Sequence, residues 1–146
     1  MATGFGFRLV GRIGGGEPQV REYSVPATDS TALYEGDPVM LVNTMDATGE
    51  VSTVIIATTG SKILGVIVGF VPSAALPYTG QYRAASTARR VLVCDDPNAI
   101  YEIQEDGLGA PLTAAQIGEM ENCPFIAGTG SPYTGLSGYM LDSSGF

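Results

Sequence analysis

The chain contains no histidine and only one lysine, Lys62, among its 146 residues. Histidine is the commonest general base and metal ligand in proteins, so its absence excludes Ser/His/Asp and Cys/His catalytic arrangements. A lysine-containing phosphate loop is excluded as well, because the glycine-rich residues 11–18 and 128–135 lack the GxxxxGK[ST] pattern. We therefore predict a protein that is not an enzyme and that binds no cofactor or metal ion.

Cysteine and long apolar runs are also scarce. Two cysteines, Cys94 and Cys123, are too few for a disulfide scaffold or a zinc site, and we expect both to be free, buried thiols. The longest apolar run, residues 63–71, is about half the length that a bilayer crossing needs. The first residues also lack the charged start and apolar core of a secretory signal. We expect a soluble protein made in the cytoplasm, with no membrane partner.

Positive charge is in short supply. Acidic residues outnumber basic ones by 15 to 7, which gives a net charge of −8. A chain this acidic is repelled by phosphate backbones, and no basic run is longer than Arg89-Arg90. We therefore expect no nucleic-acid partner.

Turn-forming residues, in contrast, are abundant, with 20 glycines and 9 prolines. Segments with period-two apolar spacing or β-branched runs predict strands within residues 20–26, 37–43, 50–60, 61–72 and 138–142. Residues 46–50 are typical of a hairpin turn. Residues 61–72 are apolar on both faces, and Gly65 and Gly69 there favour close approach of another strand or a bulge.

These patterns predict an all-β fold, a small single-domain β-barrel or β-sandwich with one short helix. The helix is expected over residues 113–121, where Thr113 and Gln116 have capping-box spacing. It is short and contains Gly118, so its stability must come from packing.

The N-terminal residues 5–13 alternate in polarity. Phe5 and Phe7 lie on one face of the expected extended segment, and Arg8 and Arg12 lie on the other. The glycine-rich residues 14–19 that follow predict a loose tether. Two interpretations remain open: an arm that lies over a neighbouring subunit, and an edge strand of the domain's own sheet.

An acidic stretch, residues 91–107, raises the question of chemistry. Asp95 and Asp96 follow Cys94 directly, but Pro97 interrupts the alternating carboxylates that a calcium loop requires. Asp-Asp-Pro-Asn is typical of a turn, because Pro97 fixes φ and the neighbouring Asp and Asn side chains accept backbone N–H groups. We interpret the stretch as a hairpin of two strands with a polar turn.

Three segments together resemble a known family. Residues 23–42, residues 61–71 followed by 81–88, and residues 93–107 are similar, in that order and spacing, to virion structural proteins encoded beside the major capsid protein in tailed bacteriophages. The resemblance covers about residues 20–144. Such proteins are commonly head decoration, or cement, proteins.

The resemblance implies a β-rich capsid-binding domain over residues 20–146, preceded by a flexible arm over residues 1–19. Its expected partners are the major capsid protein and further copies of the chain, as a homodimer or homotrimer on the virion. The net charge of −8 disfavours a place beside packaged DNA and favours the outer capsid surface. The alternative is another minor virion protein, such as a fibre base or a host-surface adhesin.

The arginines of the N-terminal region are the natural candidates for contact with acidic capsid loops. The predicted contact residues are those of the arm together with one arginine just beyond it: Phe5, Phe7, Arg8, Arg12 and Arg21.

Overall fold

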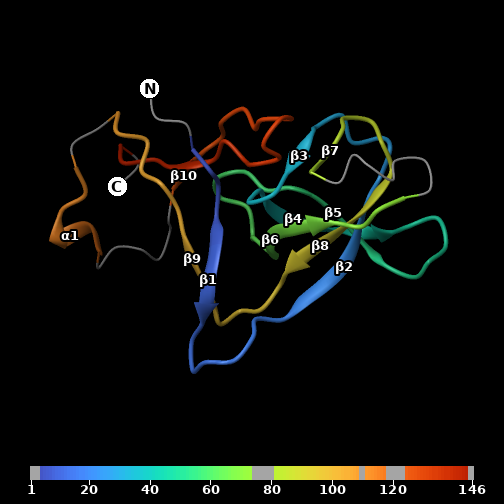
Figure 1. Cartoon of the computed structure of the whole chain (residues 1–146), viewed down its shortest axis with the longest axis horizontal. Coiled ribbons are helices and arrows are strands. Elements are labelled where there is room, and N and C mark those ends of the chain that lie inside the picture. Colours follow the sequence, from blue (N-terminus) through green and yellow to red (C-terminus); the bar gives the residue numbers. More distant parts are fainter. Residues whose placement is uncertain (1–3, 74–80, 109–110, 118–123, 145–146) are drawn as a thin grey trace.

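The computed structural model describes residues 4–73, 81–108, 111–117 and 124–144, and it has the all-β architecture that the sequence predicts. The elements, in chain order, are β1 (Arg8–Arg12), β2 (Val20–Val25), β3 (Leu33–Tyr34), β4 (Pro38–Met45), β5 (Ser52–Ile56), β6 (Gly65–Phe70), β7 (Tyr82–Arg83), β8 (Arg89–Cys94), β9 (Ala99–Glu102), α1 (Ala114–Ile117), β10 (Phe125–Ile126) and β11 (Met140–Leu141). Figure 1 shows the central strands gathered on one side, with β1, β9 and α1 on the other.

Five of the described strands form a closed barrel in the order β2-β5-β4-β6-β8. Antiparallel pairing joins most neighbours, including all six residues of β2 with β8. The barrel closes where β2 meets β5 in parallel at the single pair Ser24 and Thr53, whose hydroxyl oxygens lie 3.1 Å apart. Closure removes most of the unpaired sheet edges that would otherwise invite aggregation.

The barrel interior holds the main hydrophobic core. Its members are buried aliphatic and aromatic side chains from β2 to β8: Tyr23, Val25, Leu33, Val39, Val54, Ile67, Phe70, Val91 and Val93. Period-two alternation explains the selection, since Val91 and Val93 point inward while Leu92 between them is only partly buried. Each fully buried aliphatic side chain contributes about 1.5–3 kcal/mol to folding.

The two glycines of β6 have the roles that the sequence favours. A Cβ on Gly65 would overlap the carbonyl oxygen of Cys94 on β8, so only glycine permits this approach of the two strands. The register between β6 and β8 shifts between Ile67 and Gly69, which is the predicted bulge. Cys94 is a buried free thiol, as predicted, whereas Cys123 lies outside the described residues.

The turn at residues 46–50 forms the expected hairpin between β4 and β5. The N–H of Gly49 donates to the Asp46 carbonyl at 3.0 Å, and Gly49 has the positive φ of 71° that favours glycine. The Asp46 carboxylate also accepts the backbone N–H of Glu50 at 2.8 Å, which closes the turn from the side chain.

The predicted hairpin over residues 91–107 is wrong in its pairing, although both of its strands exist. β8 and β9 do not pair with each other; β9 instead pairs antiparallel with β1. The reason is that both edges of β8 are already occupied, one by β2 and the other by β6. The turn chemistry is confirmed, because the Asp96 carboxylate accepts the N–H of Asn98 at 2.9 Å.

The N-terminal segment is hydrogen-bonded to other parts of its own domain. The N–H of Gly6 donates to the Tyr139 carbonyl at 3.2 Å, and the N–H of Phe7 donates to the Gly36 carbonyl at 2.9 Å. A Cβ on Gly6 would overlap Ser137, so the segment fits tightly between its neighbours. Of the two interpretations of residues 5–13, the structure has the edge strand; contact of this segment with a neighbouring subunit stays a prediction.

The helix is α1 (Ala114–Ile117), which lies inside the predicted span; residues 118–121 of that span lie outside the described residues. The N–H of Thr113 donates to the Gln116 side-chain oxygen at 2.7 Å, which is one half of the predicted capping box. In the described part of the chain, no helix has the length and apolar character needed to cross a membrane.

One buried charge has no counterpart in the sequence-based expectations. Arg83, on the short strand β7, is fully buried and donates to the carbonyls of Pro26, Asp29 and Thr87. Its side chain thereby fixes the loop after β2 against the segment that precedes β8. Burial lowers the pKa of Arg83, and the nearby Asp29 carboxylate opposes that shift.

Candidate functional site

The β1–β9 ribbon, which comprises β1 and β9, carries two of the five predicted contact residues, Arg8 and Arg12. In Figure 1 it lies beside the barrel, away from the tips of β4 and β5. Arg8 pairs in register with Glu102, and Gly11 pairs with Ile100. The register shift between Leu9 and Gly11 leaves Val10 as the extra residue of a bulge, which changes the direction of its side chain.

The arginines near the ribbon meet the carboxylates of the acidic stretch. Arg8 forms an ion pair with Glu102 across the two strands. Further along, Arg12 Nε lies 2.7 Å from Asp96 Oδ2. The stretch that first suggested a catalytic or metal site therefore supplies counter-ions for the N-terminal segment.

The third arginine of the predicted set, Arg21 on β2, is held more loosely. Its Nε lies 3.5 Å from Asp95 Oδ2, and its side chain is largely exposed. Asp95 Oδ2 also accepts the hydroxyl of Tyr23 at 2.7 Å. Burial, followed by this hydrogen bond, raises the pKa of Tyr23 to about 12.

Of the carboxylates that meet these arginines, Asp96 accepts the most hydrogen bonds. The backbone N–H of Asn98, the Arg12 guanidinium and the backbone N–H of Gln19 all donate to it. These interactions, led by the Asn98 N–H, hold the pKa of Asp96 below its ordinary value. Asp96 therefore anchors the turn and both segments that approach it.

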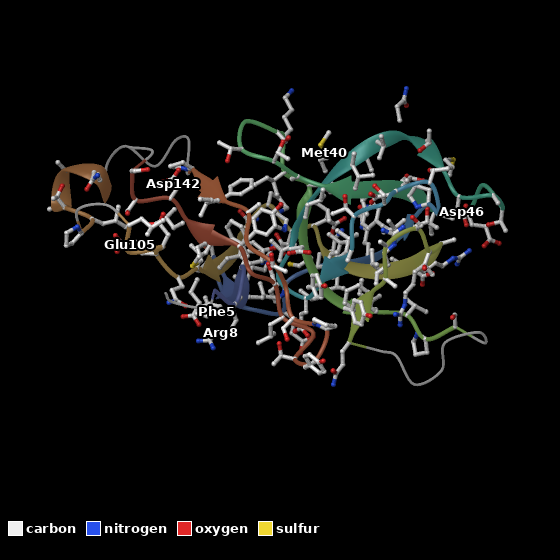
Figure 2. All side chains as sticks on the ribbon, turned by 90° about the horizontal axis from the view of Figure 1, so that it is seen from above. Phe5, Arg8, Met40, Asp46, Glu105 and Asp142 are labelled. Atoms are coloured by element: carbon white, nitrogen blue, oxygen red, sulfur yellow. The ribbon has the colours of Figure 1, made fainter. Side chains whose placement is uncertain are left out.

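The two phenylalanines of the predicted set have different surroundings. Phe7 is half-buried and makes edge-to-face contacts with Tyr101, at 6.4 Å between ring centroids, and with Phe125, at 5.9 Å. Phe7 therefore joins the ribbon to the small β10–β11 sheet. Phe5 instead lies beneath the Arg8 guanidinium, 5.1 Å from its ring centroid, and Figure 2 shows the two side chains together at the edge of the molecule.

Sequence reasoning missed the exposed aliphatic residues of the ribbon. Val10 and Ile100 are exposed, and Ile13 at the ribbon tip is 65% exposed. Together with Arg8 they form what we call the ribbon surface. Alternation alone places Ile13 on the apolar face, but the bulge at Val10 depends on pairing with β9, which local sequence does not reveal.

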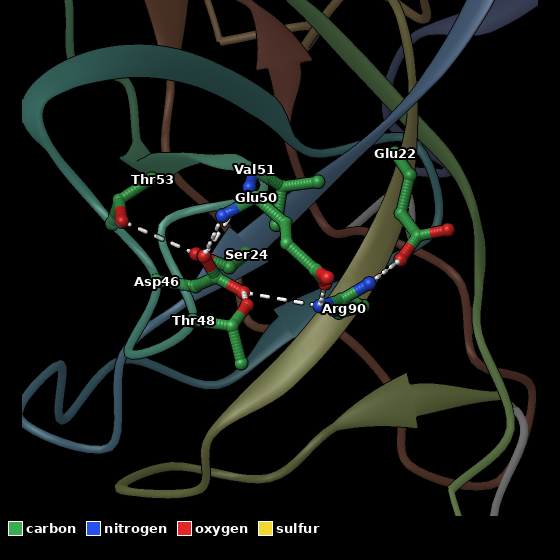
Figure 3. A network of polar contacts seen from close by, with 8 residues as sticks. All are labelled: Glu22, Ser24, Asp46, Thr48, Glu50, Val51, Thr53 and Arg90. Atoms are coloured by element: carbon green, nitrogen blue, oxygen red, sulfur yellow. Dashed lines mark hydrogen bonds and ion pairs between the residues drawn. The ribbon is translucent and has the colours of Figure 1, made fainter.

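A second polar cluster lies at the end of the barrel away from the ribbon, and Figure 3 shows it from close by. Arg90 on β8 contacts Glu22 at 2.9 Å, Asp46 at 3.1 Å and Glu50 at 2.8 Å. The Thr48 hydroxyl, followed by backbone N–H groups and Arg90, lowers the pKa of Asp46 to about 2. The carboxylates of Glu50 and Glu22 raise the pKa of Arg90. The cluster fastens the β4–β5 hairpin to β2 and β8.

A cavity of about 570 Å³ lies beside this cluster. Its walls are mostly apolar, with Val25, Met45 and Val71 among the lining residues, while Asp46 and Arg90 border it. Within residues 4–73, 81–108, 111–117 and 124–144, no three Cys, Asp or Glu side chains are grouped so that they could hold a metal ion.

Comparisons of the chain with protein-family models, with curated proteins and with solved structures found no match.

Proposed function

We propose that this protein is a decoration protein of tailed-bacteriophage heads, which binds the outer surface of the assembled major-capsid-protein lattice and stabilises it. The ordered resemblance of residues 23–107 to virion proteins of that class motivates the proposal. The observation that carries it is the ribbon surface, where exposed aliphatic side chains adjoin ion-paired arginines. We further propose a binding role without catalysis.

The chemistry of the ribbon surface suits contact with another protein. Val10, Ile13 and Ile100 gain from leaving water, at about 25 cal/mol per Å² of apolar surface buried. Arg8 is already paired with Glu102, so burying it does not leave an uncompensated charge. A guanidinium has five N–H donors, and the exposed ones of Arg8 and Arg21 remain able to meet acidic capsid loops.

Binding to an assembled lattice stabilises it by mass action. A ligand at 100 times its dissociation constant stabilises the state it binds by about 2.7 kcal/mol per site. A homodimer or homotrimer that contacts several capsid subunits adds to this through effective concentration. The net charge of −8 favours the outer surface, away from the packaged DNA.

The proposal is tested by co-sedimentation with expanded, emptied capsids assembled from the major capsid protein of the bacteriophage that, on this proposal, encodes the chain. The variant Ile13→Asp puts a charge on the ribbon tip, where the side chain is 65% exposed. We expect Ile13→Asp to weaken binding at least about tenfold, the equivalent of about 1.4 kcal/mol. Full binding by Ile13→Asp contradicts the role of the ribbon surface.

The matched control is Leu108→Asp, at a residue that is 73% exposed and lies outside the ribbon. We expect this variant to bind as the unchanged protein does. A capsid reconstruction should then place the protein on the outer face, in many copies per head. A few copies at a single vertex or on a fibre instead support the minor virion protein, and no binding to capsids at all refutes the decoration role.

A further inference from the structure

The second half of β4 extends past its neighbour in the barrel. β6 pairs with only the first two residues of β4, Pro38 and Val39, whereas β5 pairs with the other edge as far as Met45, with a register shift between Val42 and Met45. Among the described strands, none therefore pairs with the β6-side edge of β4 from Met40 to Met45. Unpaired strand edges are templates for the addition of another strand.

The backbone along this edge is oriented for such pairing. The Val39 carbonyl accepts the N–H of Leu64 at 2.8 Å, so the polar groups of Val39 point toward β6. Backbone groups alternate between the two edges of a strand, and those of Leu41 therefore point toward the same edge, beyond the last residue that β6 pairs.

Leu41 and Met45 are exposed apolar side chains along this edge. Leu41 is 50% exposed, Met45 is 55% exposed, and Asn43 between them is exposed as well. We call these three residues the β4 strip. Residues 41–45 and Ser52 also line a shallow hollow of about 310 Å³. β4 contains no charged residue, although the chain has a net charge of −8.

The pattern of the β4 strip is complementary to itself. Leu41 and Met45 pair with Val54 and Ser52 of β5, so they lie on the same face of the sheet despite the register shift between them. A two-fold axis through Asn43 that pairs two copies antiparallel then places Leu41 of each copy opposite Met45 of the other. The Asn43 amide is both donor and acceptor, so it can pair with the same group of a second copy. In this arrangement an apolar pair lies on each side of the central amide pair. Each apolar side chain then meets an apolar one, and each amide meets an amide.

The charges around the β4 strip also permit a second copy to approach. Asp46 follows the strip directly, and its carboxylate is engaged by Arg90 and Thr48. The negative charge nearest the axis is thus compensated within each copy, which limits the repulsion between two acidic chains. Figure 2 shows Met40 and Asp46, which flank the strip, well away from Arg8 on the ribbon.

We propose that the β4 strip is a self-association surface, on which a second copy of this chain docks by antiparallel pairing of the two β4 edges around Asn43. The inference goes beyond the decoration role and does not depend on it. A single pair of short strands buries less than the roughly 1,200–2,000 Å² of a standard stable interface, so we expect a weak dimer that dissociates on dilution.

Sedimentation velocity over a concentration series tests the proposal without any capsid, so its failure is distinct from failure of the decoration role. The unchanged protein should pass from the mass of one chain to that of two. Asn43→Asp places two carboxylates together on the axis and should raise the dissociation constant at least about tenfold. Leu108→Glu, at an exposed residue outside the strip, should leave the dissociation constant unchanged.

A charge-pair experiment tests the register. Leu41→Glu alone should weaken the dimer, and adding Met45→Lys should restore it, because each new carboxylate then faces a new ammonium group across the axis. Circular dichroism confirms that each variant is folded. A single-chain mass at every concentration, a trimer, a dimer unaffected by Asn43→Asp, or failure of the double variant to recover would each overturn the proposal.

Discussion

Arg12 on β1 and Asp96 in the turn after β8 lie 2.7 Å apart, joined by a hydrogen-bonded ion pair. This contact joins β1 to a turn that lies 84 residues further along the sequence. Asp96 also accepts the backbone N–H groups of Gln19 and Asn98, so one carboxylate organises three segments. An acidic residue that first suggested a site of chemistry has a structural role here.

Loss of this pair should loosen the ribbon. We expect Asp96→Ala to lower the thermal midpoint by several degrees, because two backbone N–H groups and Arg12 lose their acceptor. Arg12→Ala should have a smaller effect, and the double variant should be less destabilised than the sum of the two. Thermal unfolding followed by circular dichroism measures all three. Simple additivity would show that the pair is not coupled.

The buried carboxyl of Asp37 should make stability depend on pH. Burial raises the pKa of Asp37 from 3.8 to about 6, even though the backbone N–H of Tyr34 donates to it. A pKa raised by folding favours the protonated form. The contribution of the Asp37 carboxyl to the free energy of unfolding is therefore complete below pH 3.8. It is lost as the pH rises through about 6, and it totals about 3 kcal/mol.

The variant Asp37→Asn isolates this effect. It keeps an oxygen acceptor for the Tyr34 N–H and removes the titration. We expect the difference in unfolding free energy between Asp37→Asn and the unchanged protein to grow in favour of the variant between about pH 4 and pH 7. Urea unfolding at several pH values measures it. A difference that stays constant over that range contradicts the prediction.

Arg83 should be intolerant even of lysine. Lysine keeps the charge but cannot direct a planar fork at the carbonyls of Pro26, Asp29 and Thr87 together. We expect Arg83→Lys to reduce the unfolding free energy by about 3 kcal/mol in urea unfolding. Arg21→Lys, at an exposed arginine, is the control and should change it by less than about 0.5 kcal/mol. Equal losses of unfolding free energy in Arg83→Lys and Arg21→Lys would show that the hydrogen bonds of the buried Arg83 guanidinium do not stabilise the fold.

Gly65 and Gly11 provide a matched pair of alanine substitutions. A Cβ on Gly65 overlaps the Cys94 carbonyl in the barrel wall, whereas a Cβ on Gly11 meets nothing within 4 Å. We expect Gly65→Ala to destabilise the protein by about 3 kcal/mol or more, and Gly11→Ala to be nearly neutral. Chemical unfolding compares them. A stable Gly65→Ala variant would mean that β6 and β8 separate more easily than their packing indicates.

Local sequence patterns predicted the elements that depend on local physics. Alternation located β2, β4, β5 and β6, and glycine and aspartate chemistry located the turn at residues 46–50. The pairing of β9 with β1 was not predictable in this way, because it depends on β8 having no free edge. Two-residue strands such as β3 and β7 are too short to show any periodicity.

The candidate site was predictable only in part. The arginines were visible in the sequence, but their counter-ions lie far away along the chain and are revealed only by the fold. Arg83 lacked a signal for the same reason: an isolated arginine normally indicates the surface, and its burial depends on carbonyls of Pro26 and Asp29 in the loop after β2, which is distant in sequence.

The hydrogen bond from Gly6 to Tyr139 has a consequence for biosynthesis. Ribosomes make residue 6 long before residue 139, so this contact forms only after almost the whole described chain has emerged, whereas Phe7 can meet Gly36 much earlier. Contacts between such distant residues slow folding, because a large loop must close first. The last barrel strand ends at Cys94 and β9 ends at Glu102, so the barrel and then the ribbon can form first. The anchoring of Gly6 by Tyr139, which holds the segment leading into the ribbon, is then added last.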